Sequence, residues 1–137
     1  MAESILSDLR TLTLRRSPNQ YFAAPAGYQS TAQPHVESHT YDIAPADLCR
    51  LWCNLVEAEP RVTRLEAAAD GLAVCHVQRS ALMRYPDFVV ANFVSLDDGR
   101  SSPVIYSRSR YGYSDLGVNA RRVERWLELL NGAVAAR

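Results

Sequence analysis

The sequence contains no lysine, and all fifteen of its basic residues are arginines. Schiff-base chemistry on a lysine and the lysine of a phosphate-binding P-loop are therefore excluded. Every cation is instead a planar guanidinium, whose forked N–H donors match carboxylates and phosphates. Because a GC-rich genome is a sufficient explanation for this bias, the missing lysine by itself does not indicate a function.

A net charge is also missing. Fifteen acidic residues balance the fifteen arginines, so the formal net charge is zero. Non-specific binding to nucleic acid requires a basic surface that neutralises phosphates, and we predict no nucleic-acid partner. No stretch reaches the roughly 18 apolar residues of a transmembrane helix, so no membrane span is expected.

Cysteine and glycine are scarce. The three cysteines are an odd number, and residues 1–16 include Glu3 and Asp8 but no apolar run of the kind found in secretory signals. This pattern favours reduced thiols in the cytoplasm. The six glycines are scattered singly, which excludes a glycine-rich phosphate loop, and no Gly-x-Ser-x-Gly elbow is present.

What remains is the composition of one globular domain. The 137 residues are 47% hydrophobic and 22% charged, and a chain of this length can bury a core without disulfides or metals. Residues 1–40 are expected to form a short helix within 3–14 and then an extended arm that packs on the domain. Aromatic side chains support that packing: Tyr21, Phe22 and Tyr28. The domain itself is expected to span residues 41–137.

Hydrophobic periodicity predicts the elements of that domain. Apolar residues recur at helical spacing from Leu48 to Val56, before Pro60, and again from Val123 to Leu130, before Gly132. Alternation predicts the strands, which are expected at residues 41–43, 62–66, 72–79, 88–96 and 103–110. The order β-α-β-β-β-β-α predicts a two-layer α+β fold, an antiparallel sheet of about five strands with two helices on one face.

The most distinctive run covers residues 106–123. It contains the pattern Ser-Arg-Ser-Arg-x-Gly-x-Ser-Asp-x-Gly-x-Asn-x-x-Arg, from Ser107 to Arg122. This resembles the signature of the family known as domain of unknown function 1499. Residues 79–87 and the tripeptide Ser17-Pro18-Asn19 also resemble the family, although Gln20 stands where the family has a cysteine.

The resemblance covers about residues 17–131. It implies a shared fold but no settled activity, because none is assigned to the family. Many relatives carry an export signal or a membrane anchor; the sequence shows neither, so a cytoplasmic location is expected here.

The signature also suggests a site. Alternation along the strand at 103–110 places Arg108 and Arg110 on one face, about 7 Å apart. The following helix start offers free amides, and Arg122 lies one turn inside it. We therefore predict an anion or polar-ligand site at this turn, built from Arg79, Arg108, Arg110, Ser114, Asp115, Asn119 and Arg122. The alternative is a structural network in which Asp87 and Asp115 hold the arginines.

The preferred function is a non-enzymatic binding module for a small anionic or apolar ligand. No catalytic residue, cofactor or metal is assigned. One alternative is a small hydrolytic enzyme that uses Asp87 or Asp115. Another is a subunit whose sheet face or edge pairs with a partner protein or with a copy of itself in a homo-oligomer.

Cysteine spacing leaves one further possibility. Cys49 and Cys53 lie four residues apart on the first predicted helix and could bind zinc together with Cys75 or His76. No second cysteine pair supports that site, so we interpret the cysteines as small buried hydrophobic residues.

Overall fold

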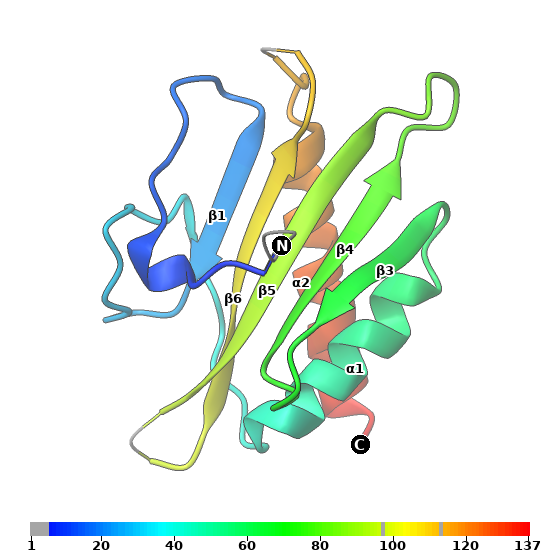
Figure 1. Ribbon diagram of the computed structural model, residues 1–137. Coiled ribbons are helices and arrows are strands. Elements are labelled where there is room, and N and C mark those ends of the chain that lie inside the picture. The colour runs from blue at the N-terminus through cyan, green and yellow to red at the C-terminus, as the bar shows by residue number, and fades with distance from the viewer. Residues whose placement is uncertain (1–5, 97, 113) are drawn as a thin grey trace.

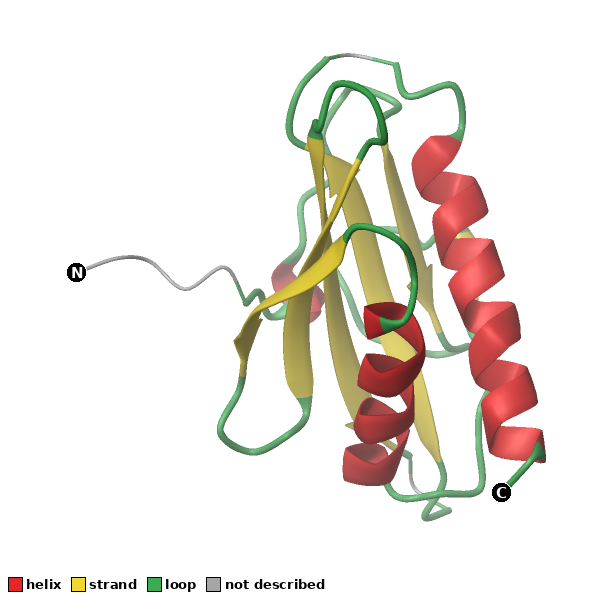
Figure 2. Ribbon diagram, turned by 90° about the vertical axis from the view of Figure 1, so that its right-hand side faces the viewer, coloured by secondary structure: helices red, strands yellow, loops and turns green. Residues whose placement is uncertain are grey.

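The structure is a computed structural model that describes residues 6–96, 98–112 and 114–137. A six-stranded sheet carries two long helices on one face (Figures 1 and 2). The strand order is β2-β1-β6-β5-β4-β3. Strands β1 and β2 run parallel, and all other neighbouring strands run antiparallel. The predicted α+β class is confirmed, although the sheet has six strands rather than five and is mixed.

The elements have the following bounds. The strands are β1 (Gln20–Ala24), β2 (Val36–Glu37), β3 (Val62–Ala67), β4 (Ala73–Arg79), β5 (Pro86–Ser95) and β6 (Ser101–Ser109). The helices are α1 (Pro45–Glu57) and α2 (Val118–Ala135), and a short 3-10 helix, η1, spans Leu9–Thr11.

The N-terminal part differs most from expectation. Strands β1 and β2 lie within the segment expected to be an extended arm, and β1 pairs with the central strand β6. The strand predicted at residues 41–43 is wrong, since Tyr41 makes only an isolated bridge to Ser101. Of the helix predicted within 3–14, the described residues form only η1, which Asp8 caps by accepting from the Arg10 N–H.

The helices pack on the sheet through two tryptophans. Helix α1 begins at Pro45, which needs no amide partner there, and Asp47 complements the positive end of the helix. Trp52 of α1 and Trp126 of α2 are fully or almost fully buried, and their rings meet edge-on with centroids 5.7 Å apart. This contact joins the two helices over the centre of the sheet.

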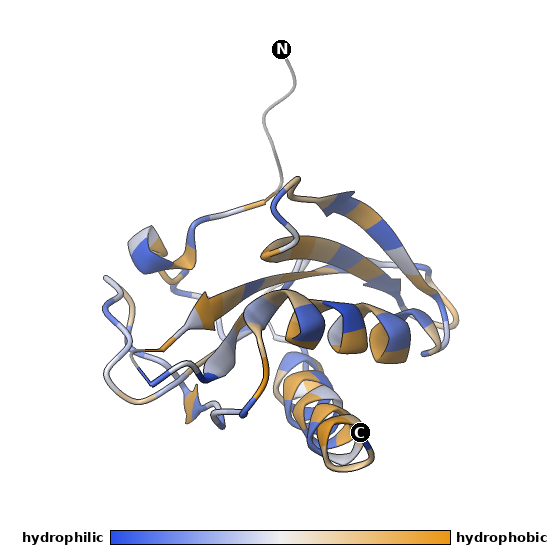
Figure 3. Ribbon diagram, turned by 90° about the horizontal axis from the view of Figure 1, so that it is seen from below, coloured by the Kyte–Doolittle hydropathy of each residue, from blue (hydrophilic) through white to orange (hydrophobic). Residues whose placement is uncertain are grey.

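The opposite face of the sheet has its own core. Leu9 of η1 is completely buried against a cluster that includes Phe22, Val90 and Tyr106. Figure 3 shows η1 and the two helices on opposite sides of the sheet. Because both faces are covered, alternate residues of the central strands enter two different cores. Within the described part of the chain, no helix has the length and hydrophobicity needed to cross a membrane.

Candidate functional site

The turn from β6 into α2 is organised around Asn119, which is completely buried. Its Oδ1 accepts hydrogen bonds from the Ser107 hydroxyl (2.6 Å) and from Arg122 Nη1 (2.8 Å). Its Nδ2 donates to Ser109 Oγ (2.9 Å) and to Asp115 Oδ2 (2.6 Å). One side chain therefore ties the start of the helix to the end of the strand.

A second buried asparagine extends this network to β1. Asn19 Nδ2 donates to the carbonyl of Gly112 (2.7 Å), and Asn19 Oδ1 accepts from Arg15 Nη2 (2.8 Å). The Asn19 carbonyl accepts from the backbone N–H of Ser109 (3.0 Å) and from Asn119 Nδ2 (3.3 Å). The tripeptide Ser17-Pro18-Asn19 and the signature at the β6–α2 turn are thus one hydrogen-bonded unit.

Asp115 caps the helix. Its Oδ1 accepts from the Gly117 N–H (2.8 Å) and its Oδ2 from the Asn119 N–H (3.0 Å). Gly117 has φ +81°, a conformation that favours glycine. Burial alone would raise the pKa of Asp115, but the hydrogen bonds from Asn119 and Gly117 outweigh it and lower the pKa. The carboxylate is therefore ionised and occupied by donors of its own chain.

Arg122 closes the network from inside the helix. Its Nη2 lies 2.7 Å from Asp87 Oδ2, and the two side chains are only 7% and 14% exposed. Its Nε donates to Gln78 Oε1 (2.6 Å), and its Nη1 to Ser107 and Asn119. Asp87 and Asp115, considered above as catalytic carboxylates, are thus both held by donors of the same chain.

The predicted convergence of Arg108 and Arg110 with Arg122 is wrong. Ser107 bonds to residues of α2, so alternation turns Arg108 to the opposite face, where its guanidinium lies 5.0 Å from the centroid of the Phe88 ring. Arg110 lies beyond the end of β6 and stacks over the exposed ring of Tyr111. The alternation itself was predicted correctly, but the face that the helices cover was not.

A surface pocket of about 310 Å³ opens beside the network. It lies between the β4–β5 loop and the β6–α2 turn, which meet at one end of the sheet (Figure 1). Four of the predicted site residues line it: Arg79, Ser114, Asp115 and Arg122. Asn119 is not among the lining residues, and neither are Arg108 and Arg110.

Arg61 is a charged lining residue that sequence reasoning missed, as it missed Tyr85 and Tyr111. It precedes β3, and its Nε donates to the carbonyl of Arg79 (2.9 Å). Arg79 Nη1 in turn donates to the carbonyl of Arg84 (3.1 Å). Among the described residues, no carboxylate forms an ion pair with Arg61 or Arg79. No local pattern marks Arg61, because the register between β3 and β4 brings it beside Arg79, whose backbone N–H donates to the Arg61 carbonyl (3.1 Å).

The rim of the pocket is apolar and exposed. Tyr85 and Tyr111 are both more than half exposed, and their rings meet edge-on with centroids 6.0 Å apart. Four more exposed apolar residues lie in or next to the same two loops: Leu82, Met83, Leu116 and Val118. In the described chain, the non-glycine residues with positive φ are Arg61, Arg84 and Leu116, which lie in the α1–β3, β4–β5 and β6–α2 connections. Such conformations cost stability and gather at functional sites.

The comparisons with known proteins agree with the resemblance seen in the sequence. The family model described as "Protein of unknown function (DUF1499)" matches residues 11–130. The matched range includes both asparagine-centred motifs and every residue of the pocket. No curated protein matches the chain. The chain therefore belongs to the DUF1499 family of proteins of unknown function.

Proposed function

We propose that the chain is a binding module whose pocket takes a carboxylate or phosphate group attached to an apolar body. The main support for this proposal comes from Arg61 and Arg79. Both line the pocket, and both lack an acidic partner among the described residues. The neighbouring charges are matched, because Arg122 pairs with Asp87.

The charge of the lining supports an anionic ligand. It holds three arginines and two aspartates, and both aspartates are already bonded within the network. A guanidinium carries five N–H donors, of which Arg61 and Arg79 each use one on a backbone carbonyl. The remaining donors suit bidentate recognition of a carboxylate or phosphate.

The apolar rim supports a ligand with an apolar body. Charge alone contributes little in an open pocket, because exposed ion pairs are worth about 0–1 kcal/mol. Apolar contact adds about 25 cal/mol for each Å² removed from water. Tyr85 and Tyr111 stand beside the arginines and offer such surface. The lining includes no histidine or cysteine, which favours binding over catalysis.

The test is a titration with 1-naphthyl phosphate, followed by ¹H–¹⁵N correlation spectra that include the arginine Nε–H signals. We expect saturable shifts at Arg61, Arg79 and the two loops, and weaker shifts with inorganic phosphate, which has no apolar body. Arg79→Ala should weaken binding at least several-fold. Arg108→Ala is the matched control: it removes an arginine from the opposite face, and binding should not change.

Two outcomes would contradict the proposal. One is that 1-naphthyl phosphate causes no saturable shifts around the pocket. The other is that Arg79→Ala and Arg108→Ala weaken binding equally, because the contact would then be a general attraction to arginine. Urea unfolding of both variants establishes that each is folded.

A further inference from the structure

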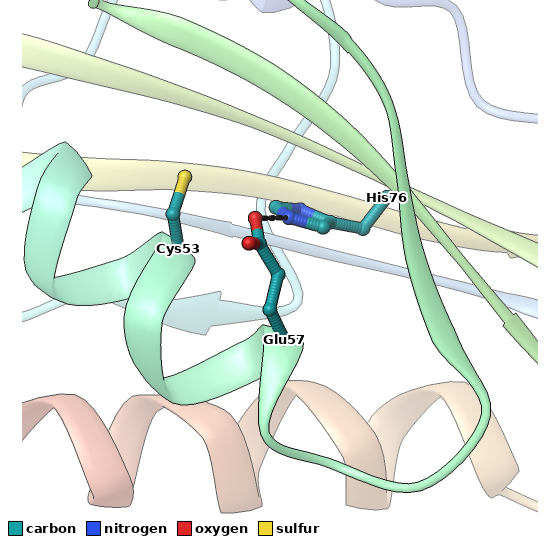
Figure 4. Close-up of side chains that lie close together, drawn as sticks. All are labelled: Cys53, Glu57 and His76. Carbon is teal, nitrogen blue, oxygen red and sulfur yellow. Dashed lines mark hydrogen bonds and ion pairs between the residues drawn. The ribbon is translucent and has the colours of Figure 1, made fainter.

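A second group of chemically capable side chains lies away from the pocket, between α1 and β4. Cys53 and Glu57 extend from α1 towards His76 of β4 (Figure 4). One ligand atom of each residue lies within 4.8 Å of the others. The sequence places Cys53 on one helical face with Cys49, but the approach of Glu57 to His76 depends on how the helix packs on the sheet.

His76 is incompletely satisfied by the protein. It is completely buried, and its Nε2 lies 2.8 Å from Glu57 Oε2. Its Nδ1 is also buried and has no hydrogen-bond partner among the described residues. A buried imidazole beside a thiol and a carboxylate is an unusual combination for a purely apolar core, and it brings together three kinds of metal ligand.

An ion could reach Cys53 from solvent. Cys53 lines a surface pocket of about 380 Å³ beside α1. Cys53 and Glu57 lie four residues apart and share one side of the helix. Cys49 lies one turn earlier, and the eight residues between it and Glu57 span about 12 Å of helix, too far for both to bind one ion.

We propose that Cys53, Glu57 and His76 form a binding site for Zn²⁺. One sulfur, one carboxylate oxygen and one imidazole nitrogen make three protein ligands of the kinds zinc prefers, and a water molecule would complete the tetrahedron. At zinc–ligand distances of about 2.0–2.3 Å, tetrahedral ligand atoms lie roughly 3.3–3.8 Å apart. The ligand atoms of Cys53, Glu57 and His76, which now lie within 4.8 Å of one another, reach that range through small side-chain rotations.

Arg64 is the group that zinc would compete with. Its guanidinium lies 2.7 Å from Glu57 Oε2, and its side chain is 45% exposed. It is therefore free to turn towards solvent when a divalent cation takes its place. The arginine now balances the carboxylate charge that the metal would balance when bound.

The test uses tag-free, reduced, metal-free protein titrated with Co²⁺ and then with Zn²⁺. We expect a near-ultraviolet thiolate-to-cobalt band, intense visible bands of tetrahedral cobalt, and loss of both when Zn²⁺ is added. Cys53→Ala should abolish the thiolate band at equal Co²⁺, because Cys53 supplies the one thiolate of the proposed site. Cys49→Ala should keep the band.

Cys75→Ala is the matched control. Cys75 is buried, as Cys53 and His76 are, and adjoins His76 in sequence, but it belongs to the core on the opposite face of the sheet. Its removal should leave the cobalt spectrum unchanged. If Cys53→Ala does not fold, Glu57→Gln serves instead, with at least a tenfold loss of zinc affinity expected.

The proposal is overturned if wild-type protein gives no thiolate band, or if Cys53→Ala and Cys75→Ala bind Co²⁺ equally. An unchanged zinc affinity in Glu57→Gln would also overturn the proposed site. Loss of the thiolate band in Cys49→Ala would contradict the assignment of Cys53 as the thiolate ligand.

Discussion

Arg122→Met is the substitution that most directly tests whether the polar network holds the fold together. Methionine keeps much of the aliphatic length of arginine and removes the guanidinium. The change takes away the donors to Asp87, Gln78, Ser107 and Asn119. It leaves the Asp87 carboxylate, which is only 14% exposed, without its ion-pair partner.

The expected cost follows from that burial. Removing one partner of a buried ion pair destabilises a protein by about 3–5 kcal/mol, because the remaining charge is uncompensated. Asp87 keeps some access to water, so we expect the low end, about 3 kcal/mol. Domains of this size are stable by about 5–15 kcal/mol, so the variant should fold with much reduced stability.

The assay is urea unfolding followed by tryptophan fluorescence, since Trp52 and Trp126 both lie in the core between the helices and the sheet. The urea concentration at the unfolding midpoint should fall, while the slope of the unfolding free energy against urea concentration stays unchanged. The control is Arg50→Met on α1, where the arginine pairs with Asp47 and the two side chains are 70% and 34% exposed. That variant should lose little stability.

A double-mutant cycle separates the ion pair from the rest of the network. Asp87→Asn and Arg122→Met should together cost less than the sum of their separate effects, with a coupling of about 1–3 kcal/mol. A loss below about 1 kcal/mol for Arg122→Met, or strict additivity with Asp87→Asn, would refute the structural role assigned to this pair. Arg122 would then be available to a ligand, as the sequence hypothesis proposed.

The other predictions concern the cap, two glycines and the N-terminal segment. The pKa of Asp115 lies below its ordinary value of 3.8, so the ionised cap stabilises the fold above that pH and this contribution is lost as the pH falls through the lowered pKa. Asp115→Asn should therefore flatten the acid side of a plot of urea midpoint against pH; an unchanged slope would count against the cap. Gly132→Ala should raise stability by about 0.5–1 kcal/mol in thermal melts, because Gly132 lies inside α2 and a Cβ there meets nothing within 4 Å. Gly117→Ala should lower it by about 1–2 kcal/mol, because φ is +81° and the new Cβ would lie 3.0 Å from Arg121 Nη1. Leu9→Ala should cost about 2–5 kcal/mol in urea unfolding, because Leu9 is completely buried; a negligible loss would show that η1 does not cover the sheet.

The two helices and the meander β3–β6 were predictable because their signals are local. In α1 the apolar residues Leu48, Trp52 and Val56 recur at helical spacing, and the structure buries all three. In β4 the alternation of Val74 and Cys75 sends them to different cores, as the period of two requires. Such patterns depend on backbone geometry within a few residues of the chain.

Strands β1 and β2 were not predictable in the same way. β1 is five residues long, and Pro18 and Pro25 stand on either side of it, so no alternation can build up. Its hydrogen-bond partners come from β6, which lies more than 80 residues away in the chain. A strand whose formation depends on so distant a partner leaves little trace in its own sequence.

The sequence by itself determined the α+β class, the apolar stripes of both helices and the motif around Asn119, because periodicity and residue type act locally. Only the tertiary structure decided which face of β6 meets α2. That choice placed Ser107 and Arg122 inside a closed network and turned Arg108 to the other side of the sheet. The pairing of β3 with β4 brought Arg61 to the pocket, and the packing of α1 on the sheet brought Glu57 to His76. Contacts between separate elements depend on how helices and strands pack and not on spacing along the chain.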